Sequence, residues 1–178
     1  MTVPYQKVSA QANLLGKLML SLCLSLFAAS SWSDEGYISD KNGCKIANPN
    51  PKPSETVTWS GNCKDGFADG EGVMQWIEND QPGGRYEGTL VHGALSGQGK
   101  LTLPDGTSYD GGWLAGKQHG TGVLRDSDGG SYSGEWKNGQ PDGRGIMRRA
   151  SGDAVRGLWK DGAYIGPEND QSKPPKDP

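Results

Sequence analysis

The chain has 178 residues, of which 29 are glycine, 33% are hydrophobic and 22% are charged. Because glycine disfavours helix interiors and the hydrophobic fraction is low, this composition excludes a helical bundle and a domain with a thick apolar core. The net charge of −3 argues against nucleic-acid binding, which depends on lysines and arginines that neutralise phosphates.

Residues 1–33 have the pattern of a secretory signal peptide: two lysines and no acid, then an apolar run, then small residues. A retained membrane anchor is the alternative, but the apolar run is shorter than the ~20 residues that span a bilayer. Cys23 would allow lipidation, although Leu22 is bulkier than the residue that usually precedes a lipidated cysteine. We therefore predict an exported protein, periplasmic or secreted, that is cleaved after Ser30 or Ser33.

Residues 34–57 are predicted to form an N-terminal cap or linker, in which the run 48–53 favours polyproline geometry. Export would leave two cysteines, Cys44 and Cys63, and a mature net charge of −5. Disulfides persist outside the reducing cytosol, so we expect these cysteines to pair; two separately packed thiols are the alternative. The bridge would close a loop of about 20 residues and stabilise the fold by roughly 3 kcal/mol.

A 23-residue repeat organises residues 58–166, and a fixed period of this kind decides the architecture. We number each unit from its opening residue, position 0. Position 0 is Tyr86, Tyr109, Tyr132 or Val155; position 2 is Gly88, Gly111, Gly134 or Gly157; position 4 is Leu90, Trp113, Trp136 or Trp159. Trp59, Gly61 and Cys63 open an earlier unit, and a four-residue insertion within 79–85 separates it from the next. Five units result, the last incomplete, and residues 58–166 hold 26 of the 29 glycines.

Each unit is predicted to be a β-hairpin. Positions 0, 2 and 4 have the same parity, so in an extended strand the two large side chains and the intervening glycine point to one face. Asn138–Gly139 and Asp161–Gly162 supply the positive φ angles of a tight turn, and an apolar residue at position 15, such as Leu124 or Met147, marks the returning strand. Because isolated hairpins are marginal in water, the units must stack. We predict an all-β fold, an elongated and twisted antiparallel sheet of about ten strands.

The ends of this sheet are expected to differ from its middle. Cys63 stands at position 4 of the first unit and Val155 at position 0 of the last, where the other units have larger side chains. Residues 167–178 are polar and rich in proline, and we predict that they form a disordered tail.

The segments 109–122 and 132–145 resemble the membrane occupation and recognition nexus repeat, or MORN repeat, almost position for position. Asp142 stands where the family usually has the histidine seen at His119. The resemblance covers residues 58–166 and implies an extended sheet that serves as a scaffold or adaptor, self-associating in some members and proposed to contact phospholipids in others. The signal-peptide pattern, together with Cys44 and the stretch 58–63, looks like exported bacterial members of the family.

The sequence offers no constellation for catalysis, a cofactor or a metal. His92 and His119 stand at different positions of the repeat, and we interpret His119 as a turn residue. Two histidines and two bridged cysteines are too few to hold a metal. The acids Glu87, Asp110 and Glu135 lie in or beside the aromatic strands, where a solvated edge explains them. We therefore predict that the protein is not an enzyme.

The candidate binding face is the set of rings that recurs once per hairpin: Trp113, Trp136, Trp159, Tyr109 and Tyr132. Neighbouring strands lie about 4.8 Å apart, so equivalent rings should repeat every ~10 Å, a spacing that suits a disaccharide repeat or an extended peptide. The alternative is that these rings form the thin core of the sheet, with part of each ring lining a groove.

These features favour a non-enzymatic scaffold that binds a protein partner with the repeat sheet, or that pairs with itself through an exposed strand edge. One alternative is a glycan-binding module that uses the tryptophans on cell-wall polysaccharide. Another is peripheral binding to phospholipid, which the net negative charge opposes and a local patch of arginines favours. The patch consists of Arg144, Arg148, Arg149 and Arg156.

Overall fold

The computed structural model describes residues 36–49 and 52–168, and every regular element in them is a β-strand. The predicted signal peptide (1–33), residues 50–51 and residues 169–178 of the predicted tail lie outside this part. The strands are β1 Tyr37–Ser39, β2 Lys45–Ala47, β3 Glu55–Trp59, β4 Asn62–Lys64, β5 Phe67–Glu78, β6 Gln81–Val91, β7 Ala94–Thr102, β8 Ser108–Leu114, β9 Lys117–Arg125, β10 Ser131–Lys137, β11 Gln140–Arg148, β12 Ala154–Lys160 and β13 Ala163–Gly166.

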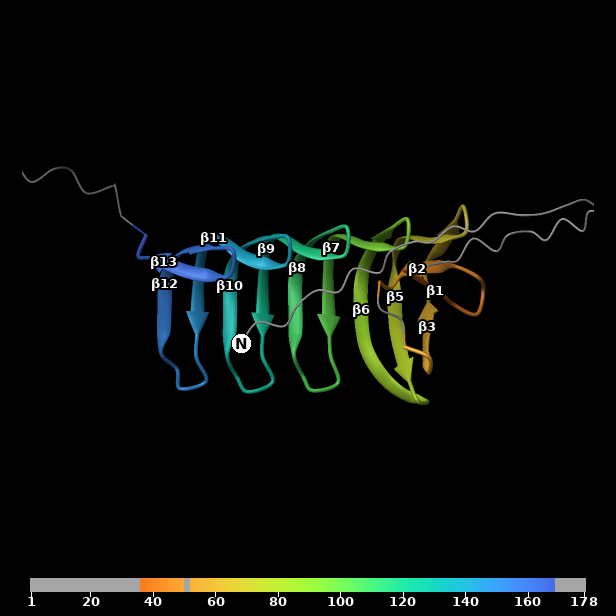
Figure 1. Ribbon diagram of the computed structural model, residues 1–178, viewed down its shortest axis with the longest axis horizontal. Helices are drawn as coiled ribbons and strands as arrows, with labels where there is room; N and C mark the ends of the chain where they lie inside the picture. Colours follow the sequence, from red (N-terminus) through yellow and green to blue (C-terminus); the bar gives the residue numbers. More distant parts are fainter. Residues whose placement is uncertain (1–35, 50–51, 169–178) are drawn as a thin grey trace, which may run out of the picture. The chain divides into compact units, whose positions relative to one another are not determined.

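The strands form one open sheet in which β5 to β13 follow one another in chain order, each antiparallel to the next (Figure 1). This order confirms the predicted all-β fold of stacked hairpins. The described sheet has 13 strands, more than predicted, because β1 and β2 join it and because the first repeat strand is split into β3 and β4. It is also not wholly antiparallel, since β2 meets β5 in parallel at Lys45 and Phe67.

Tight turns close the hairpins, as the Asn-Gly and Asp-Gly pairs predicted. Each turn has two consecutive residues with positive φ, for example Asn138 at 53° and Gly139 at 86°, which is the requirement of a type I′ turn. The turn glycine donates its N–H to a main-chain carbonyl of the preceding unit: Gly139 to Gln118, and Gly162 to Pro141, both at 2.9 Å. Hydrogen bonding between units therefore continues from the strands into the turns.

The four-residue insertion lengthens one hairpin. β5 and β6 have 12 and 11 residues, and their added pairs lead to a turn at Asn79 and Asp80, both with positive φ. The longer β5 also gives β3 a partner, because Thr56 pairs with Ile77 and Trp59 pairs with Met74.

Each tyrosine at position 0 lies over paired glycines of two neighbouring strands. Gly111 of β8 faces Gly122 of β9, and a Cβ atom built on Gly122 would overlap the hydroxyl group of Tyr109. The same arrangement recurs beneath Tyr86 and Tyr132. The glycines therefore leave the space that the rings fill, and the core of the sheet is largely aromatic.

The predicted disulfide is confirmed. Cys44 and Cys63 are bonded, with their Cα atoms 5.6 Å apart, and the bond joins the segment before β2 to β4. The loop that presents Cys44 is held by Asp40, whose buried carboxylate accepts hydrogen bonds at 2.9 Å from the N–H groups of Asn42 and Cys44.

Candidate functional site

Seven rings form a continuous series across the sheet from β6 to β13, which we call the aromatic row. Each tryptophan lies edge to face between two tyrosines, with ring centroids 5.1 to 5.6 Å apart. In order along the sheet, the row is Tyr86, Trp113, Tyr109, Trp136, Tyr132, Trp159 and Tyr164. Such contacts add about 0.5–1.5 kcal/mol each beyond the burial of area, so the row couples the second to the fifth unit, each to the next.

The polar atoms of the row bond to the main chain. The hydroxyl of Tyr109 donates to the carbonyl of Gly112 at 3.1 Å, and the indole N–H of Trp113 donates to the carbonyl of Gly99 at 2.9 Å. Trp159 breaks this pattern, because its buried Nε1 has no hydrogen-bond partner within the described residues. Apart from that end, the rings are fixed in place by the sheet itself.

Burial also changes the acidity of the row. Loss of contact with water raises the pKa of Tyr86, Tyr109 and Tyr132 to about 12, because it disfavours the charged phenolate. Nearby carboxylates also raise the pKa of Tyr109 and Tyr132. These hydroxyls are therefore neutral packing groups over the physiological pH range.

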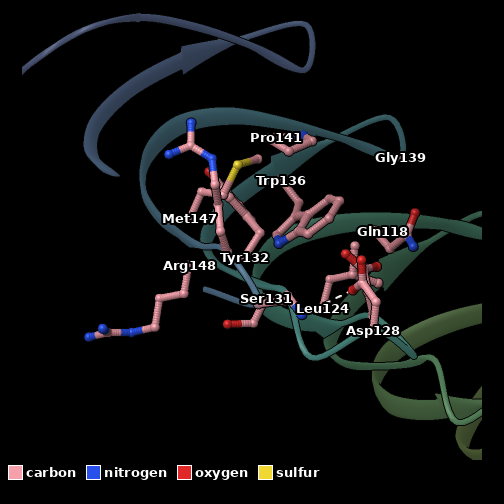
Figure 2. Close-up of a pocket in the computed structure, with 14 residues that line it drawn as sticks. Gln118, Leu124, Asp128, Ser131, Tyr132, Trp136, Gly139, Pro141, Met147 and Arg148 are labelled. Atoms are coloured by element: carbon pink, nitrogen blue, oxygen red, sulfur yellow. Dashed lines mark hydrogen bonds between the residues drawn. The ribbon is translucent and has the colours of Figure 1, made fainter. Parts of the chain in front are cut away.

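A groove of about 570 Å³ opens beside the row, between β9 and β11. Its apolar lining includes Leu124, Tyr132, Trp136 and Met147, and exposed charges of both signs border it: Asp126, Asp128, Arg148 and Arg149. In Figure 2, Trp136 lies in the middle of this set and the side chain of Arg148 extends away from it. An apolar floor with a charged border is typical of a surface that binds peptide or protein.

A second pocket, of about 510 Å³, lies between residues 36–49 and the first hairpins. Its lining includes Tyr37 and Ile46 from this segment, and Met74, Trp76 and Leu95 from the repeats. This pocket was not predictable from the sequence, because the repeat period carries no information on where residues 36–49 pack.

The five side chains predicted as a binding face lie in the core. Trp113, Trp136 and Trp159 are 5–6% exposed, and Tyr109 and Tyr132 are 1% and 3% exposed. The structure thus has the second of the two predicted arrangements, a thin aromatic core, in which Tyr132 and Trp136 also line the groove. Binding through these rings stays a prediction.

The other candidate residues are dispersed. The interpretation of His119 as a turn residue is wrong, because the turn ends at Gly116 and His119 lies within β9. His92 does stand in a turn, with its ring stacked on Phe67 at a centroid distance of 3.6 Å. In the described part of the chain, no three His, Cys, Asp or Glu side chains lie close enough to hold a metal ion.

The acids and arginines that the sequence singled out are exposed. Glu87, Asp110 and Glu135 lie at the surface, as do the four arginines of the predicted patch. Within that patch, Arg144 pairs with Glu168 at 2.7 Å, so the first residues of the predicted tail contact β11. None of the described segments is a helix that is long and apolar enough to cross a membrane.

Tyr164 of β13 is the member of the row that sequence reasoning missed. The last unit has Val155 at position 0, so its Gly157 has no tyrosine of its own to cover it. Tyr164 supplies the ring instead: it lies against Gly157 and packs on Trp159 at a centroid distance of 5.4 Å. Tyr164 stands at position 9, where the three preceding units have Leu95, Gln118 and Pro141, so the period gave no signal. The one sequence feature that pointed to an extra ring was Val155, which stands where the three preceding units have a tyrosine.

Comparison with known proteins supports the repeat. The family model described as the MORN repeat matches four consecutive segments, residues 59–81, 86–108, 109–131 and 132–154, which together make up more than half of the chain. The fifth, incomplete unit is not among the matched segments. A search of curated proteins gave no match.

Proposed function

Because the chain belongs to the MORN repeat family, we propose that it is a non-enzymatic scaffold that holds a partner protein against the groove beside its aromatic row. We further propose that it works outside the cytosol, in the periplasm or the medium. The bond between Cys44 and Cys63 supports this location, since structural disulfides persist in oxidising compartments.

The groove is the observation that carries this proposal. It combines an apolar floor, a rigid frame and a border of opposite charges, Asp126 and Asp128 on one strand end and Arg148 and Arg149 on another. A rigid apolar surface binds without a large ordering cost, and complementary charges orient the partner. The function proposed here needs neither a cofactor nor a reaction centre.

Two other partners are less well supported. A glycan would need open ring faces for stacking, but the three tryptophans of the row are 5–6% exposed. Anionic phospholipid could bind to the arginines of the patch. Two features oppose this binding: Arg144 is already paired with Glu168, and the chain as a whole has a negative net charge.

The test is cross-linking in an envelope or secreted fraction, followed by mass spectrometry. The tagged protein is compared with two variants of equal charge change. Arg148→Glu with Arg149→Glu alters the border of the groove, whereas Lys41→Glu with Lys64→Glu alters exposed residues near the N-terminal end. We expect one protein partner that the groove variant loses and the control variant keeps. Thermal unfolding of both variants checks that the fold is intact.

Three results would contradict the proposed binding surface or partner. The first is a partner that both variants retain equally, which would place binding elsewhere on the molecule. The second is enrichment on wall polysaccharide with no protein partner, and the third is flotation with anionic liposomes that high salt abolishes. Turnover of any substrate by highly purified protein would contradict the non-enzymatic part.

A further inference from the structure

In the part of the chain that the structure describes, the second strand of the last hairpin is short: β13 has four residues, whereas β11 has nine. In the preceding unit, β11 pairs along most of β10, including Ser131 with Arg148 and Tyr132 with Met147. In the last unit, β13 pairs with Leu158, Trp159 and Lys160 of β12 and then ends at Gly166. Residues 154–157 of β12 therefore pair with β11 on one side and, within the described part, with no strand on the other.

The main-chain groups at this edge point outward. The carbonyl of Arg156 accepts a hydrogen bond from the hydroxyl of Tyr164 at 3.4 Å, and Tyr164 lies on the side away from β11. In an antiparallel strand the N–H and C=O of one residue point the same way, and alternate residues point to opposite sides. Arg156 and Ala154 thus direct both groups to the open side, while Val155 and Gly157 bond toward β11.

The complete units define what would fit the open edge. Where β10 and β11 pair, a glycine at position 13, Gly145, faces position 2, and an apolar residue at position 15, Met147, faces position 0. The matching partner of Val155 would thus be an apolar side chain. Val155 is only half-buried, whereas the tyrosines at position 0 of the three preceding units are 0–3% exposed.

The next residues of this chain do not carry the pattern that the complete units have at this place. After Gly166 at position 11, position 13 is Glu168 and position 15 is Asp170, where the complete units have glycine and an apolar residue. A second copy offers no free substitute among the described residues, because all four of its glycine-x-apolar segments already lie inside its own sheet: 72–74, 99–101, 122–124 and 145–147.

We propose that this edge binds an extended segment of a partner protein, which adds a strand antiparallel to β12 and places an apolar residue opposite Val155. The segment enters beside Gly166 and hydrogen-bonds to the outward groups of Arg156 and Ala154. A glycine two residues before the apolar one lets it pass close to Gly157. This surface is separate from the groove, so each can fail its test alone.

The side chain of Tyr164 partly covers this edge at Gly157. Its ring lies against Gly157, and its hydroxyl donates a hydrogen bond to the carbonyl of Arg156. However, Tyr164 is 42% exposed and this hydrogen bond is long. An added strand would replace this hydrogen bond with main-chain ones and turn the ring outward. Removal of the ring should therefore favour strand addition.

The experiment uses a fluorescent peptide with the sequence of residues 120–126, Gly-Thr-Gly-Val-Leu-Arg-Asp, which carries the glycine-x-apolar pattern without net charge. Its anisotropy is followed during titration with the exported, disulfide-bonded chain. The control peptide has Leu124→Ser. Arg156→Pro removes the outward N–H but none of the bonds to β11, as proline is tolerated where the N–H of an edge strand faces solvent. Arg156→Ala is its matched control.

We expect saturable binding of the first peptide and at least tenfold weaker binding of the control peptide. Arg156→Pro should weaken binding about tenfold, the loss expected for one or two hydrogen bonds, and Arg156→Ala should leave it within about twofold. Tyr164→Ala should strengthen binding severalfold. Should Arg156→Pro fail to fold, the control peptide and Tyr164→Ala still decide the question.

The proposal is overturned if the wild-type chain shows no saturable binding, or if both peptides bind alike. Equal binding by the proline and alanine variants would place the peptide elsewhere on the molecule. Sedimentation of the chain without peptide tests self-pairing: a dimer that Arg156→Pro dissociates would make a second copy the occupant of the edge and would also overturn the proposal.

Discussion

The two ends of the repeat sheet are closed in different ways. At the N-terminal end, residues 36–49 lie over the first hairpins, where the N–H of Lys45 bonds to Gly66 and that of Ala47 bonds to Gly93, both at 2.9 Å. A disulfide then ties this segment to β4. At the C-terminal end, one short strand, β13, and one ring, that of Tyr164, close the sheet.

This difference shows what a repeat needs from its neighbours. An interior unit receives main-chain hydrogen bonds and ring contacts from both sides, and in a repeat protein stability is roughly a sum of such nearest-neighbour terms. At the N-terminal end, residues 36–49, which the disulfide fixes to β4, stand in place of the missing neighbour. At the C-terminal end, Tyr164 supplies a ring, but within residues 36–49 and 52–168 part of the edge of β12 has no partner strand, so we expect stability to fall toward β12 and β13.

The largest effect should come from removing a ring in the interior. Tyr132→Ala should lower the free energy of unfolding by about 4 kcal/mol, since the ring is buried and contacts two tryptophans. Tyr164→Ala, at the open end, should cost about 1 kcal/mol, because that ring is partly solvated. Urea unfolding followed by β-sheet circular dichroism measures both.

Tyr132→Phe separates the ring from its hydroxyl. This variant loses only the hydrogen bond to the carbonyl of Glu135 at 3.3 Å and should cost about 1 kcal/mol. Equal costs for Tyr132→Ala and Tyr164→Ala would show that the two positions are equivalent, and would remove the contrast between the interior and the C-terminal end.

The second effect tests the N-terminal end. Replacing both cysteines, Cys44→Ser with Cys63→Ser, should lower the free energy of unfolding by about 3 kcal/mol, because the bond constrains a loop of the unfolded chain. Hydrogen exchange should quicken in β1, β2 and β4 and stay unchanged in β10 and β11. Faster exchange spread evenly over all strands would mean that the segment stabilises the whole sheet as one cooperative unit.

The period of the sequence was sufficient to predict the hairpins, their antiparallel order and their tight turns. It succeeds because a ring over two glycines is a local rule: Tyr109, Gly111 and Gly122 specify one another through the strand geometry alone. The disulfide was predictable for a different reason: removal of the predicted signal peptide, with Cys23, would leave Cys44 and Cys63 as one possible intramolecular pair.

The ends could not be predicted in this way, because they depend on contacts outside the period. The first repeat strand is interrupted at Ser60, whose side-chain oxygen accepts a hydrogen bond from the N–H of Val73 at 2.8 Å. The parallel contact of β2 with β5 and the ring of Tyr164 over Gly157 likewise join residues at unrelated positions of the repeat. A groove lined by part of the rings was among the predicted arrangements, but its place between β9 and β11 was not. The period identifies which residues share a face but not how deeply each ring is buried.

The third effect concerns alkaline pH and the interior rings. The pKa of Tyr86, Tyr109 and Tyr132 is about 12 in the folded protein, above the value of about 10 in an unfolded chain. The unfolded state therefore loses protons first, so stability is complete below pH ~10 and falls as the pH rises toward 12. Urea midpoints measured across this range should fall less steeply for Tyr132→Phe than for the wild type. Identical slopes would contradict a raised pKa at Tyr132.

The smallest effect concerns the ion pair that joins the last two units. Asp142 accepts a hydrogen bond from the Nζ of Lys160 at 2.8 Å, and this contact lowers the pKa of the Asp142 carboxyl and raises that of Lys160. A carboxyl with a lowered pKa stabilises the fold above its unfolded value, about 4, and this contribution is lost as the pH falls through the folded value. Both side chains are near the surface, so solvent weakens the pair.

A double-mutant cycle of Asp142→Asn and Lys160→Gln, measured by urea unfolding at neutral pH, should give a coupling that is small and shrinks with added salt. A coupling as large as the cost of Tyr132→Ala would mean that charge, and not ring packing, holds the C-terminal end to the rest of the sheet.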